Sequence, residues 1–166
     1  MKDARLGIGE NIVPLKAPID SAGTAYATPF VDLKSALHAT FFVYFGVVTA
    51  TSADQSVIVT MEAATAAASG SEVQIPFRYR VSGATGANSW GAITSATASG
   101  GATILTTDDN KMLLIDVDPA GLDNLLADAR FVRAVVGIDA GGTVTLNAAW
   151  AELEPRYSQV THISAT

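Results

Sequence analysis

The chain has 166 residues, of which 49% are hydrophobic and only 16% are charged, and its formal net charge is −6. Soluble proteins usually carry about 25% charged residues, so much of this surface must be small and neutral or be covered by another chain. The ten lysines and arginines are scattered singly, which disfavours binding to nucleic acid, and the absence of cysteine excludes disulfides, thiolate metal sites and cysteine nucleophiles.

Residues 1–35 differ in pattern from the rest of the chain. Three prolines punctuate short apolar pairs such as Ile12-Val13, and no regular period emerges. We therefore expect an extended N-terminal arm that lies on a neighbouring molecule rather than a folded layer. The segment also lacks the apolar core of a signal peptide, so export by that route is not expected.

Two strands are predicted in the segment that follows. The apolar run at residues 41–48, FFVYFGVV, is far shorter than the roughly 20 residues that cross a bilayer as a helix. Its aromatic and β-branched residues favour a central strand buried on both faces. Residues 57–62 alternate, with Val57, Val59 and Met61 on one face and Ile58, Thr60 and Glu62 on the other. We expect these two strands to pair as an antiparallel hairpin.

The stretch VQIPFRYRV, residues 73–81, has the clearest period of two in the chain. Arg78 and Arg80 fall on its polar side together with Pro76, which cannot donate a ladder hydrogen bond, so an edge strand or a bulge is predicted there. Residues 82–104 are rich in glycine, serine, alanine and threonine, which predicts a long loop with one strand near residues 90–95.

The second half of the chain predicts a strand, a short helix and a second hairpin. Residues 111–117 form the strand, and Asp118 with the proline after it suits a helix N-cap and first turn. In that helix the leucines at 122, 125 and 126 share one face. Residues 130–139 and 142–153 then form the hairpin around a pair of glycines, and Pro155 ends its last strand.

These elements predict an all-β fold: an antiparallel β-sandwich, jelly-roll-like, with one short helix and an extended N-terminal arm. The arm covers residues 1–35, the β-sandwich domain residues 36–157, and a C-terminal tail residues 158–166.

Few residues suggest a metal site. Asp116, Asp118 and Gly121 fall at positions 1, 3 and 6 of a calcium loop, but alanines occupy positions 5 and 12, which need oxygen ligands. The helix cap already explains Asp118. The cluster at residues 108–110, Asp-Asp-Asn, is typical of a solvated turn. We expect no metal and no cofactor.

Catalytic patterns are also missing from the sequence. His38 and His162 have no local acid or second ligand, and His38 is expected at the start of a strand. No serine lies in a Gly-x-Ser-x-Gly motif. A pair of glycosidase carboxylates stays open from sequence, but a deep cleft is not expected in so small a sandwich. We therefore expect no enzymatic activity.

Four arginines and two tryptophans can serve in contacts. Arg78, Arg80, Arg130 and Arg133 lie on apolar strands, where arginine either shields a sheet edge or pairs with carboxylates of a partner. Both interpretations stay open for this set. Trp90, flanked by serine and glycine, is predicted to be an interface anchor, whereas Trp150 is assigned to the core.

The chain resembles a group of tailed-bacteriophage structural proteins that are encoded near the major capsid protein. The resemblance rests on TAYATPFVDLKSALHATFFVYFG, VIVTMEAATAAASG, LLIDVDPAGLD with RFVRAVVGI, and AAWAELEPRY, and covers roughly residues 22–157. It implies a capsid decoration or cement protein: a small β-sandwich that clamps the outside of an icosahedral head, often as a homotrimer. It brings no catalytic residues.

The same resemblance implies where contacts lie. The arm, the edge strands and the loops would meet the major capsid protein, through residues 1–35, 82–104 and 155–166. The candidate interface residues are Ile12, Val13, Leu15, Arg78, Arg80, Trp90, Arg156 and Tyr157. The protein would be assembled in the host cytoplasm and reside on the capsid exterior, with no nucleic acid and no membrane among its partners.

Two other functions stay open. One is a different phage virion component, such as a fibre, neck or tail module. The other is a carbohydrate-binding or adhesive β-sandwich that recognises a host-surface glycan. Both rest on analogy of fold.

Overall fold

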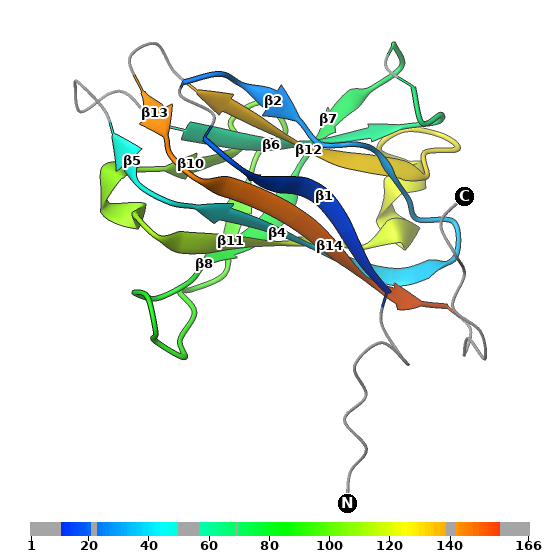
Figure 1. Cartoon of the computed structure of the whole chain (residues 1–166). Coiled ribbons are helices and arrows are strands. Elements are labelled where there is room, and N and C mark those ends of the chain that lie inside the picture. The colour runs from blue at the N-terminus through cyan, green and yellow to red at the C-terminus, as the bar shows by residue number, and fades with distance from the viewer. Residues whose placement is uncertain (1–10, 21–22, 50–56, 69, 139–141, 157–166) are drawn as a thin grey trace, which may run out of the picture.

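A computed structural model of the chain describes residues 11–20, 23–49, 57–68, 70–138 and 142–156. Two antiparallel sheets pack face to face (Figure 1), which confirms the predicted all-β sandwich. Sheet A contains, in spatial order, β1 (Asn11–Ile19), β14 (Asn147–Pro155), β4 (Ala36–Phe45), β11 (Lys111–Val117), β8 (Phe77–Val81) and β9 (Thr94–Ala96). Sheet B contains β10 (Ala102–Ile104), β6 (Val57–Ala64), β12 (Phe131–Ile138) and β2 (Tyr26–Ala27), with β3 (Val31–Asp32) on β12 and β7 (Val73–Ile75) on β6. A small ladder joins β5 (Val48–Thr49) to β13 (Thr143–Val144).

The core lies between the two sheets and is built by strand alternation. On β4, Phe41 and Val43 are fully buried, and on β6 the predicted inner face of Val57, Val59 and Met61 is also fully buried. Alternate residues of a strand point to opposite faces, so each strand contributes every second side chain to the core. Burial of such side chains is the main favourable contribution to the stability of the sandwich.

The two predicted hairpins are wrong. Strand β4 lies in sheet A and pairs with β14 and β11, whereas β6 lies in sheet B and pairs with β12. Likewise, β12 belongs to sheet B and β14 to sheet A. A strand's alternation is the same whichever sheet it joins, so the local pattern identifies the strands but not their neighbours. The chain crosses between layers where a hairpin was expected.

The segment expected to form an arm also differs from the prediction. Of residues 1–35, the described part adds β1 to the edge of sheet A and adds β2 and β3 to sheet B. Pro14 is accommodated in β1 because an edge strand pairs on one side only, and the register shifts after Pro14 and again after Lys16. Residues 1–10 lie outside the described residues, and contact of the arm with a neighbour stays a prediction.

A short helix follows β11, as predicted. It is the 3₁₀ helix η2 (Pro119–Asn124), and the Asp118 carboxylate accepts a hydrogen bond from the Ala120 N–H at 2.9 Å. Leu122 is buried and Leu126 packs against the core, but Leu125 is 46% exposed, so the prediction of one shared leucine face is wrong for Leu125. A second 3₁₀ helix, η1 (Thr106–Asp108), precedes β11.

Pro76 marks the point where one predicted strand becomes two. The chain runs along the edge of sheet B as β7 and enters sheet A as β8, so Pro76 lies between the sheets. The break explains why this residue tolerates the loss of an N–H donor. At the other end of the chain, β14 ends at Pro155, as predicted.

Candidate functional site

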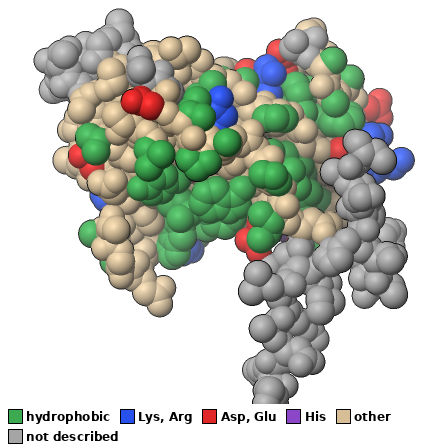
Figure 2. Space-filling view, in the orientation of Figure 1, with side chains coloured by type: hydrophobic (Ala, Val, Ile, Leu, Met, Phe, Trp, Pro, Cys, Tyr) green, Lys and Arg blue, Asp and Glu red, His purple; other side chains and the backbone are tan. Residues whose placement is uncertain are grey.

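The outward face of sheet A carries a row of apolar side chains that crosses four strands. The strand register places Pro14 beside Trp150, Trp150 beside Phe42, and Phe42 beside Leu114. Neighbouring rows of the same face add further apolar residues. We call this set the outer band: Ile12, Pro14, Phe42, Tyr44, Met112, Leu114, Ala148 and Trp150. Hydrophobic side chains gather on the front of the molecule in Figure 2, the side on which β1 and β14 lie in Figure 1.

The outer band is partly accessible to solvent. Ile12 is 64% exposed, and Phe42 and Trp150 are half-buried, with their rings stacked at 5.3 Å between centroids and 9° between planes. The prediction that Trp150 belongs to the core is therefore wrong: it lies on the opposite face of β14 from the core residues Ala149 and Ala151. Antiparallel sheets that face water on one side normally carry polar residues there.

The size of the face sets it apart from scattered surface residues. Counting β8 and the polar residues, the face spans five strands at ~4.8 Å each and about three rows of side chains, so its flat area is on the order of 500 Å². The apolar outer band is one part of this area. Apolar patches of a few hundred Å² on a monomer are often functional, and larger ones mark interaction sites. The outer face of sheet A is thus the strongest candidate for a protein-binding surface among the described residues.

A groove of about 430 Å³ opens at the β8 end of this face. It is lined by three of the predicted interface residues, Arg78, Arg80 and Trp90, which the fold brings together. Trp90 is 40% exposed and Ile93 beside it 55%. The loop holds Trp90 next to β8 through a bridge to Ser82.

The charges in the groove are arranged around Asp116. His38 Nε2 lies 2.5 Å and Arg78 Nη2 3.2 Å from the two oxygens of this carboxylate. Arg80, half-buried, has no ion-pair partner among the described residues. Aromatic and apolar side chains beside guanidinium groups are the composition of a protein interface.

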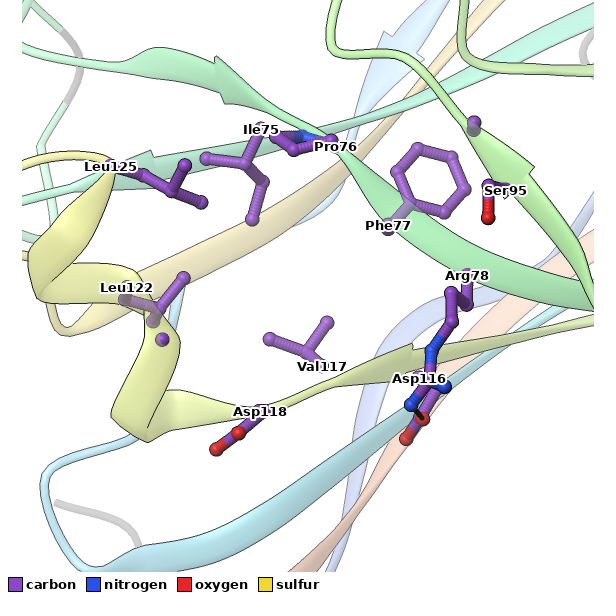
Figure 3. Close-up of a pocket in the computed structure, with 12 residues that line it drawn as sticks. Ile75, Pro76, Phe77, Arg78, Ser95, Asp116, Val117, Asp118, Leu122 and Leu125 are labelled. Carbon is purple, nitrogen blue, oxygen red and sulfur yellow. Dashed lines mark hydrogen bonds and ion pairs between the residues drawn. The ribbon is translucent and has the colours of Figure 1, made fainter.

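A second hollow, of about 320 Å³, lies beside η2 at one end of the sandwich (Figure 3). Its lining is mainly apolar, with Ile75, Val117 and Leu122 around it. The two carboxylates of the supposed calcium loop lie at its rim, Asp118 capping η2 and Asp116 paired with Arg78. Within the described residues, no group of three metal-ligating side chains is found.

The remaining predicted interface residues lie in different environments. Val13 packs against the core, and Leu15 is only 6% exposed, so the assignment of Leu15 to an interface is wrong. Both point inward because β1 covers the edge of the core. Arg156 is exposed, and its N–H donates to the Ser35 carbonyl at 2.8 Å. Tyr157 and His162 lie outside the described residues.

The other two arginines are engaged within the chain on sheet B. The Arg133 guanidinium pairs with Glu62 at 2.7 Å and Glu72 at 3.0 Å and lies 4.5 Å from the ring centroid of Phe30. The hydrogen bond from the Gly70 N–H, more than the nearby arginine, holds the pKa of Glu72 below its ordinary value. Arg130 pairs with Asp32 at 2.6 Å. Arg130 and Arg133 are thus paired with carboxylates of their own chain. For Arg78 and Arg80 both interpretations stay predictions.

The Asp-Asp-Asn cluster is a structured turn. Asp108 accepts from the Leu105 N–H and pairs with Lys111, both at 3.0 Å. Asp109 accepts from the Val48 N–H at 2.7 Å. Asn110 has a φ of 55°, the left-handed conformation that asparagine tolerates. The carboxylates therefore hold the ends of β5 and β11 together.

A buried phenol lies at the β1 side of sheet B. Burial raises the pKa of Tyr26 to about 12, and the Lys16 ammonium lies 4.9 Å from the centroid of its ring. Such a high pKa keeps the phenol neutral, and the cation–π contact ties β1 to β2 across the two sheets.

Comparisons with known proteins add little to this site. No protein-family model matches the chain, and no curated protein is significantly similar to it. A solved structure, described as the structure of infectious bursal disease virus Gt strain, matches with 10% identity and a TM-score of 0.21. The match covers 88% of this chain and 42% of the other. A TM-score this low does not establish a shared fold.

The sequence analysis missed most of the outer band. Phe42, Tyr44, Met112 and Leu114 are not among the predicted interface residues, although FFVYF and KMLLI each place apolar side chains on both faces of a strand. That double-sided pattern was the available signal.

No helix in the described part of the chain is long and apolar enough to cross a membrane.

Proposed function

We propose that the chain is a structural protein of a phage particle that binds the outer surface of an icosahedral capsid and stabilises it. The observation that carries the proposal is the apolar outer face of sheet A, with its groove of arginine and tryptophan side chains. A face of this kind suits a protein that works while covered by other protein chains. The resemblance to capsid decoration proteins supports the same function.

The mechanism is binding linked to stability. A protein that binds the assembled capsid and not its dissociated subunits shifts the equilibrium toward the capsid. Weak contacts repeated over the lattice add through multivalency. The major capsid protein is the proposed partner, and the exposed loops and strand ends, including Arg156, are the proposed contacts. The homotrimer implied by the resemblance stays a prediction.

Composition agrees with this role. The net charge of −6 disfavours contact with packaged DNA, which suits a position outside the shell. The charged fraction of 16% suits a chain whose surface is partly covered after assembly. No catalytic step is part of the proposal.

The first test is the number of copies of the chain per virion, measured by quantitative mass spectrometry of purified particles against the major capsid protein. We expect a ratio of one, or a simple fraction set by lattice positions. A handful of copies per particle would indicate a neck, tail or fibre component instead. Absence from the particle would contradict the proposal, and binding to a glycan array would then favour the adhesive β-sandwich.

A second test uses the purified full-length chain and capsids that lack it. Added chain should bind and raise the temperature at which the capsids rupture. Arg156→Glu should weaken binding, since it reverses an exposed charge at a proposed contact. The matched control is Ala127→Glu, which adds an exposed negative charge in the loop after η2, outside the proposed contacts. Capsids unaffected by the wild-type chain would refute the function.

A further inference from the structure

The composition of the outer face of sheet A is ordered across its strands. Apolar Ile12 and Pro14 lie at the β1 edge, and acidic residues follow on β14, where Glu152 adjoins Trp150 and Glu154 lies further along.

The opposite end of the face is basic, with Arg78 and Arg80 on β8, and beyond it lie apolar Trp90 and Ile93. In the middle, β4 and β11 bring Phe42 beside Leu114, and in the next row Thr40 beside Asp116. The face therefore has apolar ends, one flank with acidic residues, one basic flank, and a centre that is apolar around Phe42 and Leu114.

If the order of the strands is reversed, apolar ends lie over apolar ends and the acidic flank lies over the basic flank. The face is therefore complementary to the same face of a second copy. We infer that a second copy of this chain packs its outer face of sheet A against this one, around a twofold axis that runs parallel to the strands between β4 and β11. Such an axis reverses the order of the strands in the second copy. It places β4 over β11, β14 over β8, and β1 over the Trp90 end. Each contact then occurs twice, as in any isologous dimer.

Two rows of central contacts in the pair are apolar, and a third row brings Thr40 onto Asp116. Because the axis runs along the strands, residues that are neighbours in register face each other across it. Phe42 meets Leu114 of the second copy, and Tyr44 meets Met112, since both are register pairs between β4 and β11. At the rims, Ile12 and Pro14 meet the Trp90 end of the second copy. Packed sheets cross at about 30°, so the alignment is closest at the centre.

The flanking contacts are electrostatic. Arg80 of β8 lies opposite Trp150 of the second copy and diagonal to its Glu152, within reach of a long side chain. Arginine pairs well with both an aromatic face and a carboxylate. Arg80 is half-buried and has no ion-pair partner among the described residues of its own chain. The second copy supplies that carboxylate partner.

The area of the face is sufficient for a pair. A flat area on the order of 500 Å² on each copy gives about 1,000 Å² over both, the threshold for a specific interface. The corrugated surface of the side chains exceeds this flat area. In such a pair the second copy covers the outer face of sheet A, and the loops at the strand ends, including Arg156, stay outside the interface for contact with the capsid. The inference goes beyond the proposed capsid binding and does not depend on it.

The test measures the mass of the purified full-length chain by sedimentation equilibrium over a concentration series. We expect twice the chain mass of 17.1 kDa. Arg80→Glu places a carboxylate near Glu152 of the second copy at two symmetric positions, so the dissociation constant should rise about a hundredfold, tenfold for each contact. Lys34→Glu is the matched control and should leave the mass unchanged. Circular dichroism of each variant confirms that it folds.

Two restored combinations make the test specific to the twofold arrangement. The double variant Arg80→Glu with Glu152→Arg should pair again, because each new carboxylate meets a new guanidinium. An equimolar mixture of the two single variants should also pair, although neither does alone, since the mixed pair contains one swapped and one native contact. A wild-type monomer, the homotrimer that the resemblance implies in place of this pair, or a dimer that Arg80→Glu leaves intact would each overturn the inference. Failure of both restored combinations would also overturn it. Capsid binding by a monomeric chain would separate this failure from failure of the proposed function.

Discussion

Gly101 permits the closest approach between the loop after β9 and strand β6. Its φ is +59°, and a Cβ added there would lie 2.5 Å from the Val59 carbonyl oxygen and 2.9 Å from the Ile58 Cγ2. Gly101→Ala therefore has two costs. The left-handed conformation costs a side chain about 1–2 kcal/mol, and displacement of the β6 backbone adds about 1–3 kcal/mol. We expect a loss of roughly 2–5 kcal/mol in the free energy of unfolding.

Two other glycines separate these costs. Gly86 has a φ of +81° with no atom within 4 Å of an added Cβ, so Gly86→Ala should lose only the conformational part, about 1–2 kcal/mol. Gly121 has neither a left-handed φ nor a close atom. Gly121→Ala should be neutral or stabilise by about 0.4–1 kcal/mol, because alanine restricts the unfolded chain.

The assay is urea unfolding followed by far-UV circular dichroism, with the midpoint and slope compared across the three variants. The expected order of stability is Gly121→Ala, then Gly86→Ala, then Gly101→Ala. If Gly101→Ala costs no more than Gly86→Ala, the steric contact with β6 contributes nothing and the reasoning is refuted. A changed slope would show that the variant had altered the compactness of an end state.

Two further predictions concern the core and acid stability. Phe41 is fully buried, so Phe41→Ala should destabilise by about 3–5 kcal/mol. Phe42→Ala on the outer band should destabilise less when both substitutions are made in the Arg80→Glu chain, in which the inferred pair is weakened. Equal losses in urea unfolding of these chains would contradict the assignment of the two faces. Since the folded pKa of Glu72 is lowered, its contribution is present above the unfolded pKa and lost as pH falls through the folded pKa. Unfolding at stepped pH should therefore show a shallower acid loss for Glu72→Gln, and identical slopes would count against the Gly70 hydrogen bond.

The strands themselves could be predicted, because alternation is a local property. The inner face of β6 and the helix cap at Asp118 followed from neighbouring residues alone. The pairing of strands could not be predicted, because β4 and β6 show an inward apolar face whether they share a sheet or oppose each other. Strand β1 was missed because its proline interrupts the alternation, yet an edge strand needs hydrogen bonds on one side only.

The candidate site was predicted in part. Arg78, Arg80 and Trp90 were proposed as contacts on separate grounds, and β8 with its following loop places them in one groove. Their neighbour Leu114 could not be assigned to the groove, because that depends on the pairing of β11 with β8. Trp150 was misplaced for the same reason: the last strand has apolar residues on both faces, and only the position of the second sheet decides which face is the core.

The prediction that residues 41–48 are buried on both faces bears on what covers sheet A. Phe41 and Val43 are fully buried on the inner face, while Phe42 and Tyr44 on the outer face are half-buried. The same outer face also carries the ion pair of Asp116 with Arg78, so the apolar part that a partner can cover is the outer band around Phe42 and Leu114. A second layer on sheet A would complete the burial that the FFVYF pattern predicts, and the self-complementary order of its strands favours another copy of this chain as that layer.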